Sequence, residues 1–128
     1  QYMMFQKAIL FGDNQTAMQI LKTSNPRKQK QLGREIQGFN QSTWDEEKKS
    51  IVYKGNYLKF TQNAELLETL LATQGTLLVE ASPTDTIWGV GMELDTPELY
   101  IPSKWKGENL LGFILTQLRE DILNKREV

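Results

Sequence analysis

Two carboxylates and an indole gather in the segment 77–91, which reads LLVEASPTDTIWGVG. Glu80 ends an apolar run, Asp85 follows a polar turn, and Trp88 and Gly89 come shortly afterwards. A carboxylate can move a proton or stabilise a cation, and an indole offers a flat stacking surface. These residue types suit a site that holds a ring and acts on the bond joining that ring to a sugar.

Each of these residues also has an ordinary structural explanation. Asp85 is typical of an Asx turn, and Glu80 of an ion pair at the end of a strand. Trp88 precedes a glycine-containing turn, where an indole can simply pack. Taken singly, the structural explanations are favoured, whereas the concentration of these residues in one segment favours a site.

The composition excludes several kinds of chemistry. The 128 residues contain neither histidine nor cysteine. Ser–His and Cys–His triads, thiolate nucleophiles and the usual zinc sites are therefore excluded, and we expect neither a metal nor a redox cofactor. Carboxylates, lysines and tyrosines remain as acid–base groups. The net charge of −1 gives no strong basic field for binding long nucleic acid.

The same letters predict a cytoplasmic chain that has no membrane partner. A chain without cysteine needs no oxidising compartment. No apolar run approaches the roughly 20 residues that span a bilayer, and no secretory signal is visible. The sequence makes no prediction of oligomeric state.

Helical spacing covers most of the chain. Capping residues and apolar periodicity predict helices over 2–10, over 13–21 with Asp13 as its cap, and from Asn25-Pro26 to Gly33. Further helices are predicted from the Thr43/Glu46 capping box to Gln62, over 64–73, and over 109–123. The inward positions are predicted to be Ala17, Ile20, Leu21, Leu111, Ile114, Leu115, Leu118 and Ile122.

A short β region interrupts this pattern. Gly75 is placed to end the fifth helix in a left-handed conformation, and Thr76–Ala81 then reads as a buried strand. The segment 93–104 contains two prolines and is predicted as a loop or small hairpin. The expected fold class is therefore α+β: a predominantly helical single domain with a short strand or hairpin region.

Three cations near predicted helix faces or ends suit a phosphate. Arg34 can bind an anion through two donors, and Lys7 and Lys59 can act as point charges. Solvation of these side chains is the ordinary alternative. Trp44 lies in the first turn after its predicted cap. A functional role and a packing role that covers the core are equally favoured for it.

The stretch 106–109 reads KGEN and precedes the last predicted helix. Its backbone N–H groups could face an anion. A plain helix N-terminus explains the same letters.

Six segments occur in an order that resembles the NADAR, or YbiA-like, family. They are QYMMFQKAILFGD at 1–13, KQLGREI at 30–36, Trp44 with its charged helix, LKFTQN at 58–63, LLVEASPTDTIWGVG at 77–91, and KGENLLGFILTQLRE at 106–120. The resemblance spans almost the whole chain. We therefore expect residues 1–128 to form one NADAR-like domain that lacks the family's N-terminal segment.

This resemblance implies a hydrolase of N-ribosidic bonds. Members of the family cleave phosphorylated ribosylamino-pyrimidine intermediates of riboflavin synthesis, or remove ADP-ribose from guanine in modified nucleic acid. The implied partner is therefore a ribosylated or ADP-ribosylated substrate. Asp85 and Glu80 would be the catalytic pair, since they could stabilise oxocarbenium-like charge, orient water or hold ribose hydroxyls.

The resemblance also implies substrate-binding residues. Trp44 and Trp88 would stack on the heterocycle, and Gly89 would allow the backbone to approach it. Asn109 would hydrogen-bond the substrate or brace the loop carrying Trp88, with helix capping as an equal alternative. The phosphate would be neutralised by Lys7, Arg34 and Lys59.

Members of the family carry a further segment ahead of Gln1-Tyr2. It ends in a Glu usually regarded as catalytic, and the prediction of an enzyme holds for a protein that carries that Glu. The alternative is a non-catalytic module that binds ADP-ribose or a nucleotide. A third possibility is a structural domain with Trp44 and Tyr100 as interface anchors.

Overall fold

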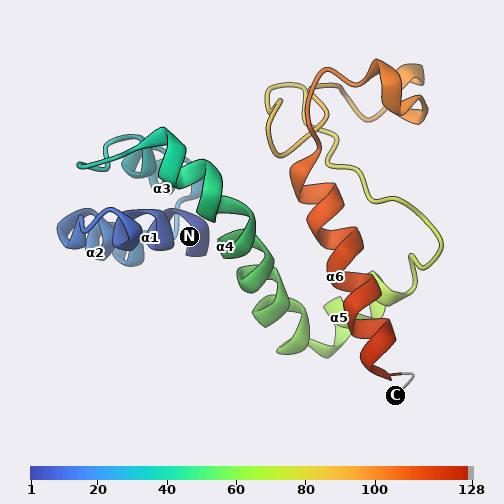
Figure 1. Ribbon diagram of the computed structural model, residues 1–128, viewed down its shortest axis with the longest axis horizontal. Helices are drawn as coiled ribbons and strands as arrows, with labels where there is room; N and C mark the ends of the chain where they lie inside the picture. Colours follow the sequence, from blue (N-terminus) through green and yellow to red (C-terminus); the bar gives the residue numbers. More distant parts are fainter. Residues whose placement is uncertain (127–128) are drawn as a thin grey trace. The chain divides into compact units, whose positions relative to one another are not determined.

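The computed structural model describes residues 1–126, and its regular elements are helices (Figure 1). They are α1 (Tyr2–Leu10), α2 (Asn14–Lys22), α3 (Pro26–Arg34), α4 (Gln41–Thr61), α5 (Ala64–Leu71), the 3₁₀ helices η1 (Pro97–Tyr100) and η2 (Pro102–Lys104), and α6 (Leu110–Arg126). The chain divides into two compact units, Gln1–Gly55 and Asn56–Val128. Each unit is described by itself.

Helices α1, α2 and α3 pack against one another in the first unit (Figure 1). Their core consists of Ala8, Ala17, Ile20, Leu32 and Ile36, with Met4, Phe5 and Phe11 against it. The prediction for Leu21 is wrong, because 48% of that residue is exposed. Neighbouring positions on a helix lie about 100° apart, so a helix that buries Ile20 turns the next side chain toward solvent.

Two of the predicted caps are confirmed. The Asp13 carboxylate accepts a hydrogen bond from the backbone N–H of Thr16 at 3.1 Å. Asn25 accepts from the N–H groups of Arg27 and Lys28, and Pro26 occupies the first helical position. Both caps are local features, because a short polar side chain replaces the missing partner of an N–H a few residues ahead.

Helix α4 begins earlier than predicted. Asn40 Oδ1 accepts a hydrogen bond from the N–H of Thr43 at 3.0 Å, and the helix starts at Gln41. Thr43 is therefore the third helical residue rather than the cap. Asparagine and threonine both cap helices well, and the first one along the chain performs this role here.

In the second unit, α5 packs against α6, as Figure 1 also shows. The predicted inward positions Ile114, Leu118 and Ile122 of α6 are buried. A neighbouring core contains Val90, Met92 and Leu99, with Val79, Ala81 and Trp105 against it. Gly75 has the predicted left-handed φ, at 88°, but it does not cap α5, which ends at Leu71 with Ala72 as its right-handed C-cap.

The predicted strand Thr76–Ala81 is wrong, and with it the α+β fold class. Residues 1–126 contain helices and irregular segments but no strand. The N–H of Leu78 donates to Thr116 Oγ1, and the Leu78 carbonyl and Glu80 N–H bond to the side-chain amide of Asn109. Side chains from α6 and its start therefore occupy groups that a neighbouring strand would pair. The segment 93–104 contains η1 and η2 in place of a hairpin.

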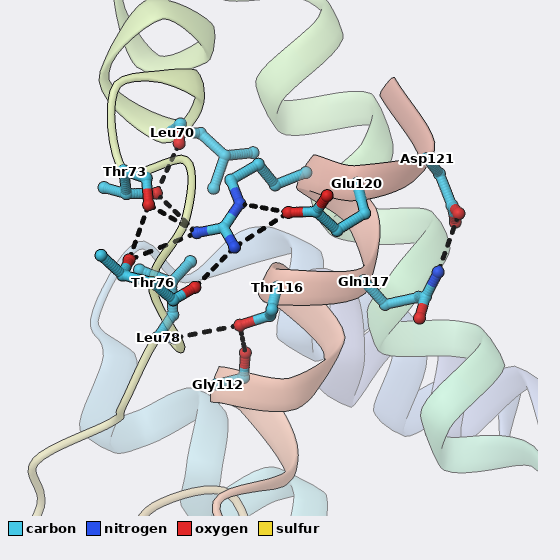
Figure 2. A network of polar contacts seen from close by, with 10 residues as sticks. Leu70, Thr73, Thr76, Leu78, Gly112, Thr116, Gln117, Glu120 and Asp121 are labelled. Atoms are coloured by element: carbon cyan, nitrogen blue, oxygen red, sulfur yellow. Dashed lines mark hydrogen bonds and ion pairs between the residues drawn. The ribbon is translucent and has the colours of Figure 1, made fainter. Parts of the chain in front are cut away.

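A buried arginine connects the turn after α5 to α6 (Figure 2). Arg119 is 2% exposed. Its Nη1 donates to the carbonyl of Thr73 at 2.9 Å, its Nη2 to the carbonyl of Thr76, and its Nε to Glu120 Oε1 at 2.9 Å. The guanidinium therefore fixes the start of the irregular segment that leads to the candidate site.

None of the helices in residues 1–126 combines the length and the apolar character needed to cross a membrane.

Candidate functional site

The first unit gathers cations and aromatic rings around the side chain of Lys7. Lys7 Nζ donates a hydrogen bond to the carbonyl of Gly33 at 3.0 Å. The same nitrogen lies 4.8 Å from the centroid of the Phe39 ring and 5.4 Å from that of the Trp44 ring. Helices α1, α3 and α4 and the loop before α4 each contribute to this cluster, so three predicted site residues share one neighbourhood once Arg34 is included.

The surroundings of Lys7 disfavour its charge. Burial lowers the pKa of Lys7 below its ordinary value of 10.5, and the positive charge of Arg34 lowers it further. Among residues 1–126, no ion pair connects Lys7 or Arg34 to a carboxylate. A bound phosphate would supply the missing negative charge and stabilise both cations.

Anion binding at Lys7 should therefore depend on pH. We expect the affinity for pyrophosphate, measured by calorimetry, to fall as the pH rises through the lowered pKa of Lys7. The Lys7→Arg variant is the control, because its guanidinium keeps its charge. The ratio of the two affinities removes the ligand's own titration. The same pH dependence in both proteins would contradict a role for Lys7.

The shift also sets the sign of a stability effect. Between the lowered pKa and 10.5, the unfolded chain holds the Lys7 proton and the folded chain releases it. The unfolded state then binds more protons, so stability rises with pH across that window.

Two aromatic residues beside Lys7 differ in exposure. Trp44 is buried, with 8% of its surface exposed, so little of the side chain is available to a ligand. Phe39 is 41% exposed and packs edge to face against Phe11 at 5.2 Å. The sequence reasoning missed Phe39. It stands in the loop GFN, where an aromatic letter does not distinguish ligand contact from packing.

In the second unit, the loop 80–91 holds the two predicted carboxylates and Trp88. Asp85 Oδ1 accepts hydrogen bonds from the N–H groups of Ile87 at 3.0 Å and Trp88 at 2.8 Å. This is the geometry of an Asx turn, the structural explanation considered for Asp85. Among the described residues, no hydrogen bond reaches Asp85 Oδ2. The turn therefore fixes the direction of the carboxylate and leaves one oxygen for chemistry.

The backbone that follows Asp85 is bound to the start of α6. The carbonyls of Thr86, Ile87, Trp88 and Gly89 accept from the N–H groups of Glu108, Leu110, Leu111 and Asn109, respectively, at 2.8–3.1 Å. The Val90 carbonyl accepts from Lys106 and Gly107. The N–H groups of 106–109, which could have faced an anion, are therefore used within the fold. The plain helix N-terminus is the better explanation of KGEN.

Close packing explains Gly89. A Cβ atom at this position would lie 2.8 Å from the carbonyl oxygen of Glu80 and 3.0 Å from that of Asp85. Only glycine avoids that overlap, so Gly89 lets the turn lie against the segment of Glu80. The Glu80 carbonyl accepts from the N–H groups of Ser82 and Val90, and its side chain is exposed. Trp88 is half-buried.

The remaining two predicted residues have different surroundings. Asn109 is completely buried and bonds to the segment of Glu80 and to Gly89. Lys59 is exposed, and the contact described for it places Nζ 5.3 Å from the centroid of the Phe60 ring. The structure thus brings Glu80, Asp85, Trp88, Gly89 and Asn109 together, and it describes no contact between Lys59 and that loop.

Two hollows adjoin the loop. The larger, of about 540 Å³, is lined by Pro83, Gly91, Met92, Glu93, Thr96, Glu98, Lys104 and Lys106. Neither predicted carboxylate lines it. Glu80 lines the smaller hollow of about 130 Å³, together with apolar residues of its own segment and of α6. Hollow size alone therefore does not identify the reacting centre.

A family model and the named relatives of this chain indicate the same family. The family model described as the NADAR domain matches residues 1–123. "N-glycosidase R617" of Acanthamoeba polyphaga mimivirus is 46% identical over 121 residues, which cover 94% of this chain and 71% of that protein. "N-glycosidase YbiA" of Escherichia coli (strain K12) is 32% identical over 112 residues, covering 88% of this chain and 63% of that protein.

A plant relative extends the comparison. "Riboflavin biosynthesis protein PYRR, chloroplastic" of Zea mays is 34% identical over 119 residues, which cover 87% of this chain and 17% of that protein. The matched region thus spans less than two thirds of the bacterial and plant relatives and 71% of the viral one. Because the family match covers nearly the whole chain and includes both structural units, this chain belongs to the NADAR domain family.

Proposed function

We propose that the protein carrying this chain is an N-glycoside hydrolase that acts on a ribose-phosphate-bearing substrate. The observation that carries the proposal is the match to two relatives named N-glycosidases over 94% and 88% of the chain. We also propose that it works in the cytoplasm, because a chain without cysteine forms no disulfide and needs no oxidising compartment.

The proposed reaction breaks the bond between the anomeric carbon and the base nitrogen. A water oxygen forms the new bond to that carbon, and a proton passes to the departing nitrogen. Asp85 would stabilise the oxocarbenium-like charge through Oδ2, since Oδ1 is held by the turn. Glu80, with its exposed carboxylate, would orient the water or hold ribose hydroxyls. A Glu upstream of this chain would complete the set, as the family resemblance implies.

The recognition elements favour a planar base and a phosphate. Trp88 is half-buried and would stack on the heterocycle beside Gly89. Lys7 and Arg34 would bind phosphate, because their mutual repulsion makes an anion favourable. The exposed Lys59 would add a further charge, and Trp44 would support Lys7 through its ring. The name of the maize relative places that protein in riboflavin biosynthesis. The family resemblance implies a phosphorylated ribosylamino-pyrimidine of that pathway as substrate, and ADP-ribosyl adducts of guanine carry the same bond type.

Mass spectrometry of one reaction mixture tests the proposal. The mixture contains a ribosylamino-pyrimidine phosphate and an oligonucleotide ADP-ribosylated on guanine, with the full-length protein. We expect release of ribose 5-phosphate or of ADP-ribose, and the product identifies the substrate class. Neither product from the full-length protein would contradict a glycosidase acting on these substrates.

One observation favours a non-catalytic module that binds ADP-ribose or a nucleotide. Asp85, the first predicted catalytic residue, has a structural role in its turn through Oδ1 that needs no catalytic role to explain it. Such a module would show saturable binding of ADP-ribose by calorimetry, without any product in the assay above.

A further inference from the structure

Asn109 uses all of its polar groups within the second unit. Its Oδ1 accepts from the N–H of Glu80 at 2.9 Å, and its Nδ2 donates to the carbonyl of Leu78 at 3.0 Å. Its backbone N–H donates to the carbonyl of Gly89 at 3.0 Å, and its own carbonyl accepts from Phe113 at 3.1 Å. No part of the residue is exposed. One side chain and one N–H thereby join the segment of Glu80 to the loop of Trp88.

The backbone conformation of Asn109 is also unusual. Its φ is 53°, in the left-handed region, and it is the only non-glycine residue with a positive φ in the described chain. Asparagine is among the few residues that tolerate this region. This conformation lets the residue bond to Gly89 through its backbone while its side chain reaches the segment of Glu80.

The amide of Asn109 replaces a neighbouring strand. In an extended chain, the groups of residues i and i+2 face the same side. Here the N–H of Leu78 bonds to Thr116, as Figure 2 shows, its carbonyl and the Glu80 N–H bond to Asn109, and the Glu80 carbonyl bonds to Val90. Every group along that edge from Leu78 to Glu80 therefore has a partner, and two of the four partners belong to one side chain.

The packing around this amide leaves no room for a ligand atom. Gly112 lies one turn along α6, and a Cβ atom there would overlap both the Leu78 carbonyl and the amide of Asn109. Gly89, whose carbonyl accepts from the N–H of Asn109, lies against the carbonyls of Glu80 and Asp85. The two segments that Asn109 joins therefore pack closely where a glycine is present.

We infer that Asn109 is a positioning residue, which sets where Glu80 lies relative to the Asp85–Gly89 loop and makes no contact with substrate. This inference rests on the proposed glycosidase function and favours bracing over substrate contact, the two roles that the family resemblance implied for Asn109. Displacing a reacting group by about 1 Å can cost roughly 100-fold in rate, even when the change lies outside the chemistry.

Two variants of Asn109 separate the inference from its alternatives. Asn109→Gly keeps the left-handed conformation and removes both side-chain bonds. Asn109→Asp keeps an acceptor for the Glu80 N–H but places an acceptor against the Leu78 carbonyl. With the ribosylamino-pyrimidine phosphate as probe, we expect kcat per folded molecule to fall by about 10- to 100-fold in both, with KM within about twofold of wild type.

The control is Arg119→Lys. This substitution alters another buried polar group on α6 that holds Thr73 and Thr76 rather than Glu80. It should lower stability while leaving kcat per folded molecule unchanged. Normal kcat in the Asn109 variants, or a raised KM at normal kcat, would overturn the inference, because the latter is the signature of direct substrate contact.

Amide hydrogen exchange keeps the two proposals distinguishable. We expect Asn109→Gly to speed exchange at the Glu80 N–H selectively, and Arg119→Lys to leave that amide protected. An inactive wild-type protein with this exchange result would contradict the proposed function alone. Unchanged exchange at Glu80 in Asn109→Gly would overturn the positioning role, whatever the activity.

Discussion

Asp85→Asn is expected to lower turnover at least about 100-fold, the low end for a positioned acid–base group. The substitution removes the negative charge that would face the developing cation. It retains an Oδ1 acceptor, so the hydrogen bonds from the N–H groups of Ile87 and Trp88 can persist. The loop should keep its conformation, so the change in turnover should reflect the loss of the charge alone.

Asp85→Ala is the comparison that exposes the structural role. It removes the carboxylate and both turn hydrogen bonds, so we expect lower stability in addition to lost turnover. Near-normal kcat in Asp85→Asn, together with a destabilised Asp85→Ala, would remove Asp85 from the mechanism and leave it as a turn residue. That outcome would favour the non-catalytic nucleotide-binding module.

Arg119→Met is expected to lower the free energy of unfolding by about 1–3 kcal/mol, the cost of a buried group left without a partner. Methionine has no donor for the carbonyl of Thr76, which the guanidinium now satisfies, whereas the carbonyl of Thr73 keeps its hydrogen bonds from the N–H and Oγ1 of Thr76. Arg119 is 2% exposed, so water cannot easily replace those bonds. Denaturant unfolding of the wild-type and variant proteins measures the difference.

Glu120→Gln tests the other partner of Arg119. The Glu120 side chain is 45% exposed, and solvent screens its ion pair. We expect a loss below about 1 kcal/mol, as for other surface pairs. A loss equal to that of Arg119→Met would show that the ion pair, rather than the two carbonyls, stabilises the junction.

The helices of the first unit could be predicted because their signals are local. Asp13 and Asn25 each bond to N–H groups two or three residues ahead, so the residues around them contain the capping interaction, although Asp13 also accepts from the distant N–H of Gln37. Thr76–Ala81 could not be assigned in this way. Its partners, Asn109 and Thr116, are 29 to 38 residues away, and an apolar run does not reveal whether a strand or a helix side chain will pair with it.

In the candidate site too, features with local partners could be predicted from the sequence and features with distant partners could not. The Asx turn at Asp85 is readable from the sequence, because its acceptor and donors lie within three residues. The contact between Lys7 and Phe39 joins positions 32 residues apart and depends on how α1 and α3 pack. The role of Gly89 also needed the structure, because its letter permits either ligand approach or close packing.

The binding of 86–90 to the start of α6 has a consequence for variation in this loop. All of these bonds are made by main-chain atoms, and Thr86 and Ile87 expose their side chains. The side chains of Thr86 and Ile87 can therefore be exchanged without loss of the hydrogen bonds that hold the loop, whereas Gly89 has no room for a side chain. An inserted or deleted residue would instead shift successive carbonyls away from their donors and leave the first turn of the helix unsatisfied. This loop should tolerate substitutions at Thr86 and Ile87 but not a change in its length.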